Sequence, residues 1–145
     1  MIVPDVNVLV GAFHRDATGH EEHARWLREM VAGPVEIGLV DLVMVGFVRL
    51  VTHRRIFEDP APTGAAMAFV DGLRRAPRAR SLQSTAGVHE RFRQLVAVDV
   101  QVRGNLVPDA WIAAVALAHG AEVATRDRGF ARFEGLTLVD PTQSV

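Results

Sequence analysis

The chain lacks cysteine and lysine, and each absence excludes whole classes of function. Without cysteine there is no disulfide, no thiolate nucleophile and no thiolate metal site, which agrees with a reducing compartment. All sixteen basic residues are arginine. Walker-type nucleotide binding, Schiff-base catalysis and lysine-assisted aspartyl-phosphate chemistry are therefore excluded, because each requires a lysine.

Long apolar runs and a strong net charge are also missing. No window approaches about 18 consecutive apolar residues, and the opening MIVPDVNVLV places a proline and a carboxylate where a signal peptide needs an apolar core. We therefore expect a cytoplasmic protein without membrane contact. The net charge is only −1, so any nucleic-acid site must be local, although the planar fork of arginine suits phosphate.

The pattern of apolar residues predicts one α/β domain over residues 1–145. Strands are expected at 2–5, 35–40, 79–82, 122–125 and 136–139, and helices at 6–13, 19–32, 42–53, 64–75, 88–97 and 106–119. Thr18, Asp41 and Thr63 stand where helix N-caps are favoured. Alternating strands and helices favour a three-layer sandwich with a mostly parallel central sheet.

Three of the nine aspartates stand where a parallel sheet would place a functional site. Asp5 ends the first predicted strand, Asp127 follows the AEVAT strand, and Asp109 lies in the first turn of the alanine-rich helix. The helix dipole alone could account for Asp109. Asp5 is harder to explain without a site, because an acid between Pro4 and an apolar run needs a partner when it lies near the interior.

A cluster of carboxylates fits a hard divalent cation. Mg²⁺ and Mn²⁺ prefer carboxylate oxygens and water, and one or two direct protein ligands suffice for them. Such a site can activate water and stabilise charge on a phosphate with one ion or two. We therefore expect Asp5, Asp109 and Asp127 to hold Mg²⁺, or Mn²⁺, and to form the catalytic apparatus.

Several segments resemble a known family, in order along the whole chain. The opening IVPDVNVLV, the central LVPDAWIAAVALAHGAEVATRDRGFARF and the closing LTLVDP are similar to the PIN domain, and most closely to VapC-type toxin ribonucleases of bacterial toxin-antitoxin modules. The segment GFVRLVTHRRIF is similar to a helix in an actinobacterial branch of these toxins. The resemblance implies Mg²⁺- or Mn²⁺-dependent RNA cleavage, a homodimer and a small VapB-like antitoxin as partner.

The resemblance also assigns roles to individual residues. Asp5, Asp109 and Asp127 match the family's acids. Asn7 matches the asparagine or threonine two residues after the first acid, and Thr125 matches the small hydroxyl residue two before the last acid.

One position departs from the family pattern. Many PIN domains carry a glutamate in the third helix where this chain has Gly46, and Asp41 could partly replace it or could be a plain N-cap. The missing acid leaves open whether one or two metal ions bind.

Other candidate residues have a structural interpretation beside the functional one. Arg49 lies on an otherwise apolar helix face and could make an ion pair or contact phosphate. Arg126 and Arg128 flank Asp127 and could contact RNA or only be exposed turn residues. His20 and His23 stand three apart, which is the wrong spacing for a zinc-protease motif, so we interpret them as a solvated helix start.

We predict the toxin component of a type II toxin-antitoxin system, an Mg²⁺-dependent endoribonuclease that cleaves phosphodiester bonds with metal-activated water. A catalytically weakened PIN-like module that binds RNA or protein is the alternative, motivated by Gly46. A small-molecule hydrolase is disfavoured, because no histidine or serine constellation accompanies the acids.

Overall fold

A five-stranded parallel sheet forms the centre of the computed structural model, which describes residues 1–143. The strands lie in the order β3-β2-β1-β4-β5, and every adjacent pair is parallel. They are β1 (Ile2–Pro4), β2 (Ile37–Leu39), β3 (Ala79–Ser81), β4 (Glu122–Ala124) and β5 (Leu138–Val139). The predicted α/β fold with a parallel central sheet is confirmed.

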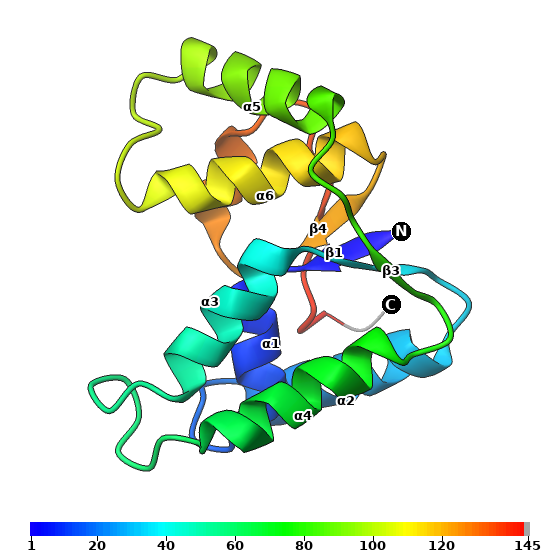
Figure 1. Ribbon diagram of the computed structural model, residues 1–145, viewed down its shortest axis with the longest axis vertical. Coiled ribbons are helices and arrows are strands. Elements are labelled where there is room, and N and C mark those ends of the chain that lie inside the picture. Colours follow the sequence, from blue (N-terminus) through cyan, green and yellow to red (C-terminus); the bar gives the residue numbers. More distant parts are fainter. Residues whose placement is uncertain (144–145) are drawn as a thin grey trace.

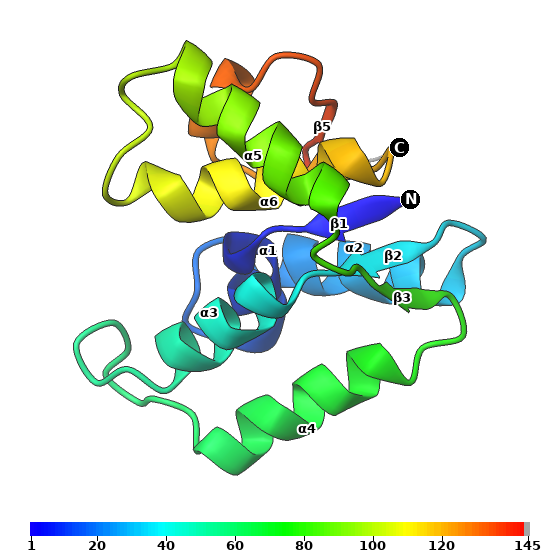
Figure 2. The same ribbon diagram turned by 45° about the horizontal axis from the view of Figure 1, so that its top comes forward.

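Helices cover both faces of this sheet and complete the three layers. They are α1 (Val6–Phe13), α2 (His20–Ala32), α3 (Asp41–Val51), α4 (Thr63–Arg74), α5 (Ala86–Val98), α6 (Leu106–Ala118) and the 3₁₀ helix η1 (Arg128–Arg132). Helices α5 and α6 pack together on one side, and α1 to α4 lie on the other (Figures 1 and 2). Within the described residues, no helix is long and apolar enough to cross a membrane.

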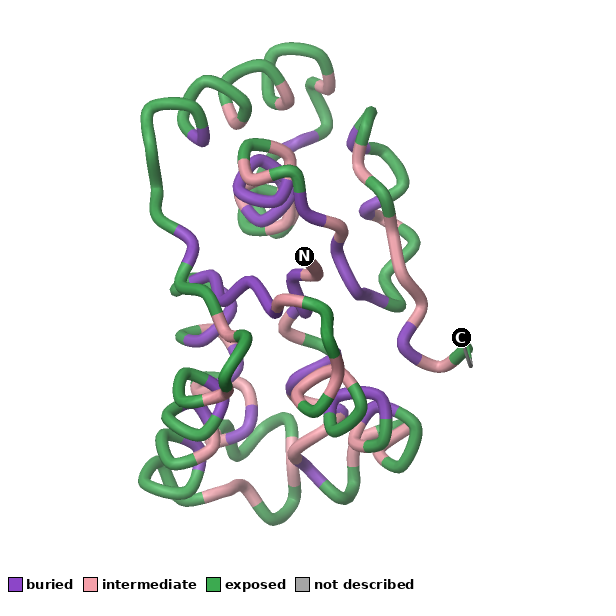
Figure 3. The backbone as a smooth tube through the Cα atoms, turned by 90° about the vertical axis from the view of Figure 1, so that its right-hand side faces the viewer, coloured by how far each residue is buried: buried purple, intermediate pink, exposed green. Residues whose placement is uncertain are grey.

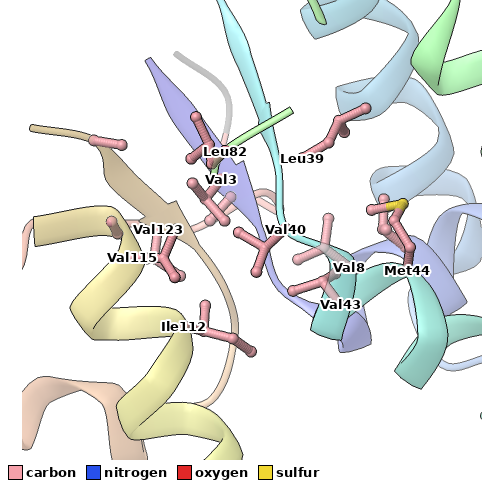
Figure 4. Close-up of a cluster of buried hydrophobic side chains, with 14 of the residues drawn as sticks. Val3, Val8, Leu39, Val40, Val43, Met44, Leu82, Ile112, Val115 and Val123 are labelled. Atoms are coloured by element: carbon pink, nitrogen blue, oxygen red, sulfur yellow. The ribbon is translucent and has the colours of Figure 1, made fainter. Parts of the chain in front are cut away.

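The core lies on both sides of β1 and β4. Figure 3 shows the buried segments gathered along the inner strands and α6, while the outer faces of α4 and α5 are exposed. Ile112 and Val115 of α6 face Val123 of β4, and Val8 and Val43 lie on the other side of the cluster (Figure 4). Alanines at the buried face of α6 let this helix approach the sheet closely.

The predicted helices exist, but three of their predicted N-caps are wrong. Helix α2 begins after Gly19, whose left-handed backbone (φ 74°) ends the preceding turn, and no side chain caps it. Asp41 and Thr63 are the first residues inside α3 and α4, and the cap positions are Val40 and Pro62. Helix α2 thus begins one residue later, and α3 and α4 begin one residue earlier, than the side-chain preference for N-caps predicts.

The strand order places two predicted acids at one edge of the sheet. Strands β1 and β4 are neighbours, with Pro4 opposite Ala124, so the residues that follow them leave the sheet side by side. Asp5 follows β1, and Thr125 and Asp127 follow β4. Helix α6 starts near the same edge (Figure 1), which brings Asp109 from the other direction.

Candidate metal-dependent active site

Asp5 is buried and tightly held at the end of β1. Its side chain is the N-cap of α1, and its Oδ1 accepts a hydrogen bond from the Val6 amide at 2.6 Å. The residue is only 5% exposed. Burial raises the pKa of Asp5, although hydrogen bonds from Thr125 and Val6 oppose this effect. Burial disfavours the negative charge of this carboxylate, and a cation bound beside it would stabilise that charge.

Thr125 connects Asp5 to the chain that carries Asp127. Because Pro4 pairs with Ala124, the next residues are neighbours, and the Thr125 hydroxyl donates to Asp5 Oδ2 at 2.9 Å. The same oxygen of Thr125 accepts from the Asp127 amide and from Asn7 Nδ2, each at 3.0 Å. One donor and two acceptor sites are thus all used. Asn7 Nδ2 also donates to Asp5 Oδ2 at 2.6 Å.

Asp109 and Asp127 lie close enough to Asp5 for their charges to interact. The pKa of Asp109 is raised to about 6, first by burial and then by the charges of Asp5 and Asp127, and the charge of Arg132 opposes the rise. Asp127 is exposed and caps η1, accepting from the Gly129 amide at 2.7 Å. Because neighbouring negative charges raise the pKa of Asp109, a cation bound beside these carboxylates would be stabilised.

A cavity of about 630 Å³ opens beside these acids. Asp5, Asn7 and Asp109 line one part of it, and α3 contributes a largely apolar wall with Arg49 as its basic residue. Asp127 is not among the residues that line this cavity, although its charge reaches both other aspartates. The cavity is large enough for a nucleotide-sized group beside the carboxylates.

The donor chemistry fits a hydrated hard cation. Within residues 1–143, no three acidic, histidine or cysteine side chains lie close enough to form a ready-made metal cluster. The converging groups are carboxylates, two of which have raised pKa values. Mg²⁺ and Mn²⁺ retain most of their water and need few direct ligands, so this looser arrangement suits them better than zinc, which takes a closed set of ligands.

Comparisons with known proteins show the family to which the chain belongs. A family model of the PIN domain matches residues 2–136. Ribonuclease VapC43 of Mycobacterium tuberculosis is 41% identical over 97% of this chain and 95% of its own length. The chain belongs to the VapC ribonuclease family of PIN-domain proteins. Ribonuclease VapC31 of the same organism is 34% identical over 97% of this chain and 99% of its own.

Solved structures show that the VapC-family chain has the same fold. VapBC2 from Rickettsia felis, bound to a DNA fragment from its promoter, matches with a TM-score of 0.69 and 18% identity, over 96% of this chain and 98% of that one. VapC20 of Mycobacterium tuberculosis, a toxin that cleaves the sarcin-ricin loop, matches with a TM-score of 0.66 and 18% identity, over 90% and 93%.

In this VapC-family chain, the glycine that replaces the family's helix glutamate lies close to α1. Gly46 lines the cavity, and a Cβ atom there would lie 3.1 Å from Val6 Cγ2. A side chain at this position would therefore be tightly packed and would require Val6 to shift by a few tenths of an ångström. Asp41 lies outside the cavity, 84% exposed at its side chain and paired with Arg74 at 2.9 Å. The structure thus separates Asp41 from the three aspartates.

The three candidate RNA-contacting arginines have different surroundings. Arg49 lines the cavity, and among the described residues it makes no ion pair, so the structural ion pair considered for it is absent there. Arg126 lies between Gly19 and Asp140: its guanidinium approaches Gly19, and its charge adds to the hydrogen bonds from Thr142 that lower the pKa of Asp140. Arg128 is exposed at the start of η1.

Two features of the site region escaped the sequence analysis. His23 is buried at 3% exposure against Gly11, and its Nδ1 donates a hydrogen bond to Gly19 O at 2.7 Å, so the predicted solvated helix start is wrong. Arg132, at the end of η1, is the basic residue whose charge acts on Asp109. Its position in the RDRGFAR segment carries no local signal of this contact, because the contact depends on how η1 packs against α6.

Proposed function

We propose that this VapC-family chain is the toxin of a toxin-antitoxin pair and an Mg²⁺-dependent endoribonuclease. The observation that carries the proposal is that Asp5 and Asp109 line one cavity, while Asp127 lies close enough to act on Asp109 through its charge. Burial and the charges of Asp5 and Asp127 raise the pKa of Asp109 to about 6. Several carboxylates held near one another favour the binding of a divalent cation.

The residues of the site have two roles: the aspartates would bind the cation, and their polar neighbours orient Asp5. Asp5 and Asp109 would bind the cation from the ends of β1 and α6, and Asp127 would add charge from its turn. Thr125 and Asn7 fix the orientation of Asp5 Oδ2 through their hydrogen bonds. When bound, Mg²⁺ would supply an activated water and stabilise the charge that develops on the phosphate.

Arg49 is the best-placed candidate for contact with an RNA phosphate. It lines the cavity opposite the aspartates on α3, and in the described part of the chain no carboxylate pairs with it. A guanidinium free of a protein partner can form two parallel hydrogen bonds with a phosphate. Arg126 and Arg128 remain candidates for weaker contacts with the RNA backbone near Asp127.

A small VapB-like antitoxin is the proposed protein partner. A groove of about 840 Å³ lies between α3 and α4, lined by apolar side chains such as Met44, Val45 and Met67. Val45 is 67% exposed, which suits an apolar face of an amphipathic helix. Helix α4, and not α2, forms the second wall of this groove, because α1 lies between α2 and α3.

Val45 and Arg49 line both the groove and the cavity, so a bound antitoxin would lie next to the aspartates.

We also propose that the chain forms a homodimer, which light scattering on the purified protein would test.

Asp5→Asn tests the proposed catalytic role directly. Burial already favours the neutral form of Asp5, and asparagine can still cap α1, so the variant should fold like the wild type. We expect cleavage of RNA to be abolished, measured on a mixed RNA substrate with Mg²⁺ or Mn²⁺. Retention of metal-dependent cleavage by a cleanly purified Asp5→Asn protein would refute the assignment.

A second candidate function rests on Gly46. Since this position carries no acid and Val6 occupies the adjacent space, the pocket has one carboxylate fewer than many PIN domains, and a weakened, RNA-binding module is the alternative. Wild-type protein that binds RNA but cleaves no substrate with either metal would favour this alternative over the ribonuclease.

A further inference from the structure

Arg132 links two parts of the site that are far apart in the sequence. Its Nε donates to Gly129 O at 3.2 Å, within η1, and its Nη1 donates to Asp99 Oδ2 at 3.2 Å. Asp99 follows α5, where its Oδ1 accepts from the Gln101 amide at 2.9 Å. The arginine and aspartate side chains are 29% and 31% exposed, so the pair is more enclosed than the other two ion pairs of the described residues.

The same turn holds Asp127. The Gly129 amide donates to Asp127 Oδ1 at 2.7 Å, and the Gly129 carbonyl accepts from Arg132. Arg132 therefore holds the carbonyl group of the same glycine whose amide orients Asp127. Through Asp99, this turn is also tied to the segment between α5 and α6, which leads into Asp109.

The packing of η1 also connects Arg132 to the helix that carries Asp109. Helix η1, which ends at Arg132, packs against α6, whose first turn holds Asp109. The turn braced by Arg132 therefore lies between the Asp127 and Asp109 parts of the site.

We propose that Arg132, held by Asp99, is a positioning residue for the metal site, which braces the turn that orients Asp127. This inference deepens the proposed function and rests on it. The residue acts through the carboxylates and does not contact substrate. Outer hydrogen-bond partners of metal ligands commonly change metal affinity by about 10–100-fold, so an effect of about tenfold is expected here.

The test compares Arg132→Ala, Asp99→Ala and the double variant, with Mn²⁺ binding to the RNA-free protein measured by calorimetry. Each single change should weaken Mn²⁺ binding about tenfold, and the double variant should be no weaker than either, because both remove the same brace. Arg132→Lys keeps the charge but cannot bridge Gly129 and Asp99 together, so it should recover only part of the affinity. Arg80→Ala, which removes the Arg80–Glu36 pair on strand β3, should leave it unchanged.

Kinetics separate positioning from direct contact with substrate. At limiting Mn²⁺, cleavage by Arg132→Ala should fall about tenfold, with recovery at saturating Mn²⁺ and an unchanged KM for RNA. A raised KM that excess metal does not correct would mean phosphate contact and would overturn the inference. Unchanged Mn²⁺ binding in both single variants, or full recovery by lysine, would also overturn it. Asp5→Asn is measured in parallel: if it keeps metal-dependent cleavage, the proposed function itself fails.

Discussion

Asp109→Asn distinguishes a metal-site carboxylate from an ordinary helix-start acid by the sign of its effect on stability. An acid that only complements the helix dipole stabilises the fold, and its loss should cost about 0.3–1 kcal/mol. In this structure burial, Asp5 and Asp127 raise the pKa of Asp109 from 3.8 to about 6, so its ionised form opposes folding when no metal is present. Asparagine should therefore stabilise the metal-free protein.

The magnitude follows from the pKa. A shift of about two units corresponds to about 3 kcal/mol, and solvent screening of the partly exposed Asp109 reduces this to about 1 kcal/mol. Because the folded pKa is raised, the wild type is most stable below about pH 4 and loses this contribution as the pH rises through about 6. The advantage of Asp109→Asn should thus be absent near pH 4 and complete by about pH 8.

Thermal unfolding in EDTA at pH 4 and pH 8 measures this difference. At pH 8 a gain of about 1 kcal/mol should raise Tm by about 3–4 °C. Glu22→Gln is the matched control, because Glu22 is an exposed first-turn acid of α2 outside the cavity, and its loss should lower stability slightly. An Asp109→Asn protein that is less stable than wild type at pH 8 in EDTA would refute the reasoning. With Mg²⁺ added, only the wild type should gain stability.

Three further predictions concern the surroundings of the site. Thr125→Val removes the hydroxyl between Asp5 and the Asp127 amide, so urea unfolding should show a loss of about 1–3 kcal/mol in the free energy of unfolding. Thr125→Ser should retain most of the stability, and equal values for both variants would contradict the hydrogen-bond network. Gly11→Ala should destabilise the protein by about 1–3 kcal/mol, because the new Cβ would lie 2.7 Å from His23 Nδ1. Gly72→Ala has open space around it and should stabilise the protein by about 0.5–1 kcal/mol. Effects of the same sign in the two variants would contradict the packing of His23 against Gly11. Asp41→Ala removes only a surface ion pair with Arg74, so it should lower the stability by less than about 1 kcal/mol and leave the affinity for Mn²⁺ unchanged. A clear loss of Mn²⁺ affinity would mean that Asp41 belongs to the metal site.

Local sequence signals predicted most of the fold, because periodicity and chain breakers are local properties. The alternation of apolar runs located the five strands and six helices, and the parallel sheet followed from that alternation. The predicted N-caps at Thr18, Asp41 and Thr63 are wrong, because the exact first residue of a helix is not a local property of the sequence. A cap depends on one residue's backbone angles, which the packing of neighbouring elements can shift by a residue.

The sequence by itself singled out Asp5, Asp109 and Asp127, since acids that end strands or begin helices in an α/β pattern already indicate one edge of a sheet. Only the tertiary structure decided how these acids are held. The Thr125 hydroxyl meets Asp5 across 120 positions of sequence, and it does so because β1 and β4 pair in one register. Likewise, Arg132 reaches Asp99, and Gly46 meets Val6, through packing between elements that no local pattern records.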